Sequence, residues 1–140
     1  MEEIPYEFFE HTADIGIKVR GQDLNQLFQN AALAMFDIIA RKHSVTKTSL
    51  EIIEIKQEAE DLEELFVNWL NELLSLSATK ELIFSDFKIQ KLTVRNLQAT
   101  VSGSPAKGYE LTTEIKAATY HGLKLEQSKS GWQAEVIFDV

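Results

Sequence analysis

Two short segments, one near each end of the chain, carry side chains suited to chemistry. The first is the polar stretch His11-Thr12-Ala13-Asp14, which interrupts two apolar runs and would present its side chains from exposed backbone. The second is Phe138-Asp139-Val140, where an aspartate stands one residue before a terminal carboxylate. Carboxylate oxygens are ligands that calcium and magnesium prefer. The end of the chain therefore indicates a site for a hard cation.

Both segments also have an ordinary structural explanation. In the first, Thr12 or Asp14 would hydrogen-bond its own backbone and form a turn, which is the commoner use of such residues. In the second, Asp139 would belong to an ordinary hydrophilic chain end. Spacing alone does not decide between a cation site and these structural roles, so both interpretations stay open at this point.

A third segment, Glu114 to Gly122, combines charged, small and aromatic residues in a predicted strand. Alternation would place Glu114, Lys116 and Ala118 on one side of that strand. Lys116 would then either reach into a pocket beside small residues or extend into solvent, which is the commoner position for lysine.

The composition and motifs exclude several kinds of site. There is no cysteine, so disulfides, thiolate zinc sites and cysteine nucleophiles are absent. The sequence contains no P-loop, dinucleotide-binding glycine pattern, nucleophile elbow or zinc-binding His-Glu-x-x-His helix. The stretch 103–108 lacks P-loop spacing, and we expect it to be a loop between strands.

Hydrophobic periodicity predicts the elements that must position these residues. Helical spacing follows the N-cap candidates Asp23 and Asp61, with the first helix ending near Ala40 and the second carrying an apolar stripe to Leu74. Two-residue alternation predicts strands over 6–10, 15–19, 46–56, 87–94, 99–101, 111–120, 123–128 and 132–140, with a bulge at 90–91 and turns at 121–122 and 130–131. The pattern indicates one α+β domain over residues 1–140, a largely antiparallel sheet with two amphipathic helices packed on one face.

Charge and hydropathy limit the environment and the partners. The net charge is −8, with 22 acidic residues against 14 basic ones, which disfavours tight direct binding of nucleic acid. A negative surface suits a cation or a positively charged protein partner. The N-terminus lacks the sequence of a signal peptide, and no apolar stretch is long enough to span a bilayer. We expect a cytoplasmic protein that does not contact a membrane.

The chain resembles the archease family in four motifs that occur in the family's order. They are His11-Thr12-Ala13-Asp14-Ile15-Gly16, Trp69-Leu70-Asn71-Glu72-Leu73-Leu74, Glu114-Ile115-Lys116-Ala117-Ala118-Thr119-Tyr120-His121 and the terminal Phe138-Asp139-Val140. The last residue is Val140 where the family often has isoleucine or leucine. Backbone or terminal oxygens would be unaffected by that difference.

The resemblance implies an accessory factor of an RtcB-type RNA ligase, which joins RNA ends in tRNA splicing or RNA repair. Archeases are not enzymes themselves; they promote guanylylation of the ligase by GTP and allow multiple turnover. Members bind a divalent cation, seen as calcium, and magnesium or manganese would suit the same oxygens. The implied metal ligands are Asp14, Asp139 and Val140, and Lys116 is implied to support activity. We expect the residues around them to contact the ligands or the partner: His11, Thr12, Glu114, Tyr120 and His121.

Two other functions compete with this one. A free-standing metal-dependent hydrolase would use the two carboxylates and one metal to activate water, but only His11 and His121 offer a general base. A chaperone-like RNA-processing module would have to bind RNA or protein through a surface that the sequence does not reveal.

Overall fold

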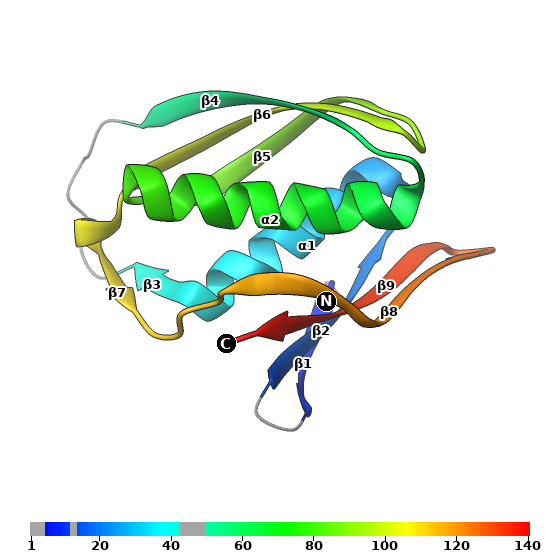
Figure 1. The fold of residues 1–140 in the computed structure, drawn as a ribbon, viewed down its shortest axis with the longest axis horizontal. Helices are drawn as coiled ribbons and strands as arrows, with labels where there is room; N and C mark the ends of the chain where they lie inside the picture. The colour runs from blue at the N-terminus through cyan, green and yellow to red at the C-terminus, as the bar shows by residue number, and fades with distance from the viewer. Residues whose placement is uncertain (1–4, 12–13, 43–49) are drawn as a thin grey trace.

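The two helices lie side by side in a layer between two antiparallel sheets (Figure 1). The computed structural model describes residues 5–11, 14–42 and 50–140. Its elements, in chain order, are β1 (Tyr6–His11), β2 (Asp14–Gly21), α1 (Leu24–Ile39), β3 (Ala40–Lys42), β4 (Glu51–Glu58), α2 (Leu62–Lys80), β5 (Leu82–Leu92), β6 (Asn96–Pro105), the 3₁₀ turn η1 (Ala106–Gly108), β7 (Tyr109–Leu111), β8 (Ala117–Ser128) and β9 (Gly131–Asp139).

The predicted α+β class is confirmed, but the strands do not form one sheet. Those that are described form a sheet in the order β1-β2-β9-β8, a second in the order β4-β6-β5, and the short pair β3-β7. Helix α1 packs mainly on β2 and β5, while α2 packs on β8, β5 and β4. Each helix therefore contacts both large sheets. Such contact needs buried residues on more of the helix surface than the single apolar stripe of a helix that packs on one sheet, and both helices have them.

Side-chain caps begin both helices where the sequence predicts them. The Asp23 carboxylate accepts a hydrogen bond from the Gln26 amide at 2.8 Å, and the Asp61 carboxylate accepts one from the Glu64 amide at 2.8 Å. Each bond satisfies one of the backbone donors that a helix start leaves without a partner. The two helices are thus defined by local sequence.

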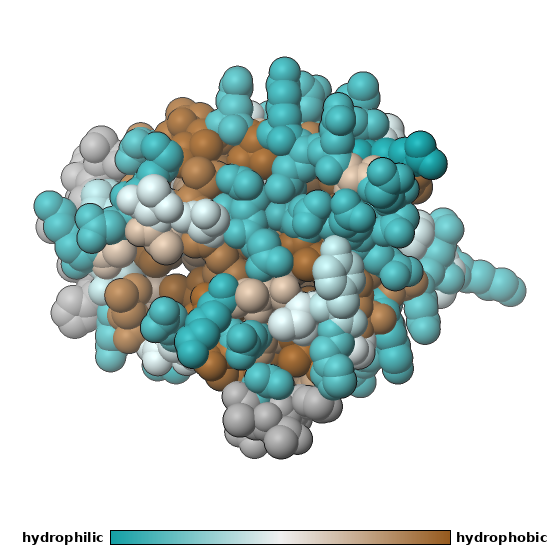
Figure 2. Space-filling model, viewed as in Figure 1, coloured by the Kyte–Doolittle hydropathy of each residue, from teal (hydrophilic) through white to brown (hydrophobic). Residues whose placement is uncertain are grey.

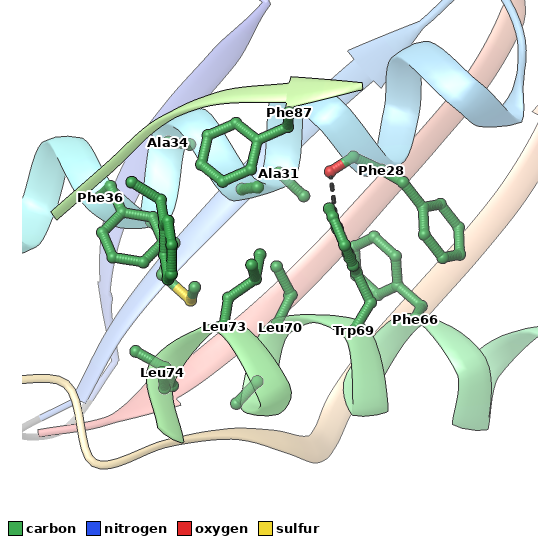
Figure 3. Packing of buried hydrophobic residues seen from close by; sticks show 14 of the residues in the cluster. Phe28, Ala31, Ala34, Phe36, Phe66, Trp69, Leu70, Leu73, Leu74 and Phe87 are labelled. Carbon is green, nitrogen blue, oxygen red and sulfur yellow. Dashed lines mark hydrogen bonds between the residues drawn. The ribbon is translucent and has the colours of Figure 1, made fainter. Parts of the chain in front are cut away.

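The core lies between the helices and is centred on Trp69 (Figure 3). Trp69 is fully buried, and its indole Nε1–H donates to the carbonyl oxygen of Phe28 on α1 at 2.9 Å. Its ring meets Phe87 of β5 edge-on, with 6.3 Å between the ring centroids. One side chain thus joins α2 to α1 and to a strand of the β4-β6-β5 sheet.

Neither described helix has a segment long and apolar enough to cross a membrane.

Two predicted connections are wrong. Residues 103–105, predicted to be loop, complete β6, and Gly103 is needed there because a Cβ would lie 2.4 Å from the carbonyl oxygen of Ile83 on β5. His121 and Gly122, predicted to form a hairpin turn, lie inside the single strand β8, where the register with β9 shifts between Thr119 and Lys124. Gly122 has φ +66°, which suits an irregularity within a strand as well as a turn.

The predicted bulge near Lys91 is confirmed by a register shift between Ile89 and Lys91. The turn at 130–131 is also confirmed, since Ser128 pairs with Gly131 across it. The strand predicted over 111–120 is interrupted, because residues 112–116 belong to neither β7 nor β8. The strand predicted over 46–56 begins at Glu51 in β4, and residues 46–49 lie outside the described part of the chain.

Candidate functional site

Strand register brings Asp14 and Asp139 together at one end of the β1-β2-β9-β8 sheet, which lies below the helices in Figure 1 and is called the lower sheet from here on. Strand β2 begins at Asp14 and β9 ends at Asp139, and the antiparallel pairing of the two strands runs as far as Ile15 opposite Phe138. One further step along both strands sets Asp14 opposite Asp139. Directly opposed residues share a face of the sheet. Phe138 is buried in the core, so the two aspartates lie on the opposite, outward face.

Lys116 reaches the same end of the sheet from a third segment. Its backbone N–H donates to the carbonyl oxygen of Asp139 at 2.8 Å, and the next residue, Ala117, pairs with Asp139 across the sheet. The end of β9 accordingly lies beside the beginning of β8 in Figure 1. Residues 14, 116 and 139, far apart in the sequence, thus come from three neighbouring segments.

The predicted alternation around Lys116 is wrong. Ile115 and Ala118 are both buried, whereas Lys116 is exposed and does not share the buried side of Ala118. The spacing of three between the buried residues means that the two-residue repeat slips once in this segment. The slip leaves the Lys116 side chain in solvent and still buries an apolar residue on each side of it.

The neighbouring candidates take different positions. His11 pairs with Asp14 through the β1–β2 ladder, while its side chain and all of Thr12 lie outside the described part of the structure. Glu114 is exposed two residues before Lys116. Tyr120 and His121 are also exposed, but lie farther along β8, where the pairing with β9 is interrupted between Thr119 and Lys124.

Tyr120 lies within electrostatic range of the acidic start of α2. Burial raises the pKa of Tyr120, and the charges of Glu64 and Asp61 raise it further. Its side chain is nevertheless 56% exposed. The structure therefore associates Tyr120 with the first turn of α2 rather than with the aspartate pair.

The donor atoms at this end of the sheet suit a hard cation. Asp14 and Asp139 offer carboxylate oxygens, and Val140 adds its backbone carbonyl oxygen; calcium and magnesium prefer such ligands. Among the residues that the structure describes, no group of three or more His, Cys, Asp or Glu side chains is arranged to hold a metal. The aspartate pair would consequently leave much of a cation's coordination shell to water or to a partner, since calcium takes 6–8 oxygens.

A largely apolar cleft of about 440 Å³ adjoins the segment that leads to Lys116. Leu74 of α2, Ile39 of α1 and Leu111 of β7 line it, and Glu114 and Ile115 close one side. Figure 2 shows apolar side chains around a hollow in this region. Leu111 is 63% exposed, so apolar surface is accessible close to the candidate site.

One contributing residue was not predicted from the sequence. The Asn71 carboxamide accepts a hydrogen bond from the Ala118 amide at 2.8 Å and donates one to the Ala118 carbonyl at 3.1 Å. Asn71 thereby joins α2 to the beginning of β8. In the sequence, Asn71 stood within one of the family motifs and within the apolar stripe of a helix, but neither position indicates that its side chain bonds to a strand, and an amide is equally typical of a solvated side chain.

Comparison with known proteins agrees with the fold and the motifs. Residues 6–140 match the model of the Archease protein family. The chain is 40% identical to a protein archease of Pyrococcus abyssi, with 96% of this chain and 98% of the relative covered. It is 38% identical to a protein archease of Methanosarcina acetivorans, with 96% and 95% covered.

Two solved structures share the architecture. The solution structure of Methanobacterium thermoautotrophicum protein 1598 superposes with a TM-score of 0.75 at 32% identity, covering 99% of this chain and all of that one (100%). The crystal structure of an archease from Thermotoga maritima, described as a possible chaperone, superposes with a TM-score of 0.68 at 26% identity, covering 94% of each chain. Family model, relatives and fold agree along almost the whole sequence, and the chain belongs to the archease family.

Proposed function

We propose that this protein is an accessory factor that activates an RtcB-type RNA ligase in tRNA splicing or RNA repair. It promotes guanylylation of the ligase by GTP and sustains multiple turnover, and it catalyses no reaction of its own. Membership of the archease family supports this function, and so does the convergence of Asp14, Lys116 and Asp139 at one end of the lower sheet.

The single observation that carries the proposal is the register that pairs Ile15 with Phe138 and so brings the next residues, Asp14 and Asp139, to the same end of the sheet. These carboxylates, with an oxygen of Val140, would hold a divalent cation, calcium first and magnesium or manganese as alternatives. The bound cation would supply a positive charge to which phosphate or carboxylate oxygens of a partner could bind. Because only two side-chain carboxylates are offered, the site is suited to an ion shared between two molecules.

Lys116 adds a second positive charge next to this pair. Its side chain is exposed, while its backbone is bonded to Asp139. An exposed ammonium group has three donors and would bind a phosphate or a carboxylate on the ligase. The acidic protein as a whole does not favour free RNA as the ligand, since its net charge is −8.

The test mixes this protein with an RtcB-type ligase, GTP, a divalent metal and an excess of RNA ends. Wild type is expected to accelerate guanylylation and to sustain ligation past the first turnover. Asp14→Ala and Asp139→Ala are expected to lose both effects, and Lys116→Ala to reduce them to a measurable remainder. Asp86→Ala and Lys88→Ala, at exposed positions on β5 of the other sheet, are matched controls and should act as wild type.

Two outcomes would contradict the proposal. If the ligase is equally fast with and without wild-type protein, the activating function is wrong, and the chaperone described for the Thermotoga relative becomes the better hypothesis. If the protein alone hydrolyses phosphoesters in a manner that depends on Asp14 and Asp139, it is a hydrolase. Isothermal calorimetry with calcium tests the site separately: unchanged binding in both aspartate variants would remove the proposed cation ligands.

A further inference from the structure

The start of β8 is held from its outer side by a side chain rather than by another strand. β8 is an edge strand in the order β1-β2-β9-β8. Ala118 near its start is only 4% exposed, so an N–H or C=O group there needs a partner. The Asn71 carboxamide serves both groups, accepting from the N–H at 2.8 Å and donating to the C=O at 3.1 Å. A primary amide carries a donor and an acceptor, so it replaces the pair of bonds that a neighbouring strand would make.

Immediately before Ala118, two consecutive residues face one residue of β9. Lys116 bonds to the Asp139 carbonyl through its N–H, and Ala117 is the strand partner of Asp139. Lys116 lies just outside β8, so the chain enters the strand with two residues meeting one, as they do in a β-bulge, and such an irregular entry redirects side chains at the end of a strand. The burial of both Ile115 and Ala118, three residues apart, is the expected result of such a slip.

We propose that Asn71 is a positioning residue that fixes this irregular entry into β8 and thereby directs Lys116 into solvent beside Asp139. In a regular strand, Lys116 would share the side of the buried Ala118. Asn71 holds Ala118 by two hydrogen bonds, and Ile115 is buried against the core. Lys116 can then stay exposed only if the two-residue alternation slips between Ile115 and Ala118. The inference rests on the proposed function for its biological consequence, but not for its structural content.

The two hydrogen bonds specify asparagine at this position. Leucine has nearly the same shape, but it leaves both backbone groups of Ala118 without a partner. An ionised aspartate still accepts from the N–H, but it cannot donate to the carbonyl oxygen and repels it. The expected order of disturbance is therefore Asn71→Leu greater than Asn71→Asp.

The first experiment needs no ligase. Amide hydrogen exchange followed by NMR is expected to show at least a tenfold loss of protection at Lys116 and Ala118 in Asn71→Leu, and a smaller loss in Asn71→Asp. Asn68→Leu, one turn earlier on α2, is the control, because the bond that Asn68 makes to Gln57 uses its backbone carbonyl. Unchanged protection of Lys116 in Asn71→Leu would overturn the proposal whether or not the protein activates a ligase. If Asn71→Leu does not fold, Asn71→Asp gives the same test.

The second experiment is a double-mutant comparison of ligase activation. A positioning role predicts that Asn71→Leu lowers the activation at least tenfold, and that adding it to Lys116→Ala causes no further loss. A purely structural role predicts losses that multiply, so multiplying losses would refute the positioning role. A wild-type protein that fails to activate the ligase would refute the proposed function alone, since the exchange experiment stands independently of it.

Discussion

Removing one carboxylate at the end of the lower sheet is expected to have opposite effects on stability with and without a cation. Asp14 and Asp139 lie next to the last pair of β2 and β9, Ile15 with Phe138, so continuing the register sets them opposite each other. Like charges in directly opposed positions destabilise a sheet. Asp139→Asn removes one charge and nearly preserves shape. In EDTA the variant should therefore be more stable than wild type, whereas in calcium wild type should be the more stable protein.

The repulsion between the carboxylates is much weaker than the stabilisation by a bound cation. The difference in stability between the variant and wild type should therefore change sign between EDTA and calcium. Cross-strand pairs contribute about 0.2–1 kcal/mol, and the exposure of Asp139 places the repulsion near the lower end, at about 0.3 kcal/mol. A cation at 100 times its dissociation constant stabilises the native state by about 2.7 kcal/mol. A domain of this size shifts its melting temperature by about 3 °C per kcal/mol. The variant should thus melt about 1 °C higher in EDTA and about 7 °C lower in calcium.

Thermal unfolding followed by circular dichroism at low ionic strength measures both differences. Asp86→Asn, an equivalent change at an exposed position of β5, is the control and should follow wild type in both buffers. Equal stabilisation of wild type and Asp139→Asn by calcium would refute the cation site. A variant that melts below wild type in EDTA would refute the reasoning about repulsion, since it would mean that Asp139 stabilises the metal-free sheet.

Two other side chains give predictions about the fold. Burial, the hydrogen bond to Asp37 and the charge of Asp37 raise the pKa of Tyr6 to about 12. Between pH 10 and 12 the unfolded chain loses the proton that native Tyr6 keeps, so wild-type stability should fall with rising pH in urea titrations. The fall should be smaller in Tyr6→Phe, which keeps only the contribution of Tyr120. Gly103→Ala should lose about 1–3 kcal/mol by the same method, because its Cβ would lie 2.4 Å from the Ile83 carbonyl oxygen. Gly108→Ala meets nothing within 4 Å and should be nearly neutral; equal losses would refute the packing argument.

Features set by neighbouring residues could be predicted from the sequence. The helix starts after the N-caps Asp23 and Asp61 are examples, because a cap and the first turn that it serves lie within three residues. The bulge near Lys91 could also be predicted, because a slip in two-residue alternation is visible in a single strand.

Features set by distant partners could not be predicted in the same way. His121 and Gly122 look like a turn in isolation, and only pairing with β9 shows that the chain continues through them as one strand. The division into separate sheets depends on which side of each helix a strand covers, and hydrophobic periodicity does not record that. The slip before Ala118 was missed because its cause is Asn71, 47 residues earlier in the chain.

The candidate site shows the same division between local and distant information. The motifs identify Asp14 and Asp139, but the pattern of either strand alone does not say that they are opposite each other. That follows from the position of β9 between β2 and β8, which requires the last strand of the chain to enter the middle of the sheet. A cation held by both aspartates would join the beginning of β2 to the end of β9. Its binding free energy would then contribute directly to the stability of the completed sheet. Variants that loosen β9 should therefore weaken cation binding even when both carboxylates are intact. A loss of ligase activation consequently assigns a residue to the site only when the cation affinity and the stability of the same variant are also measured.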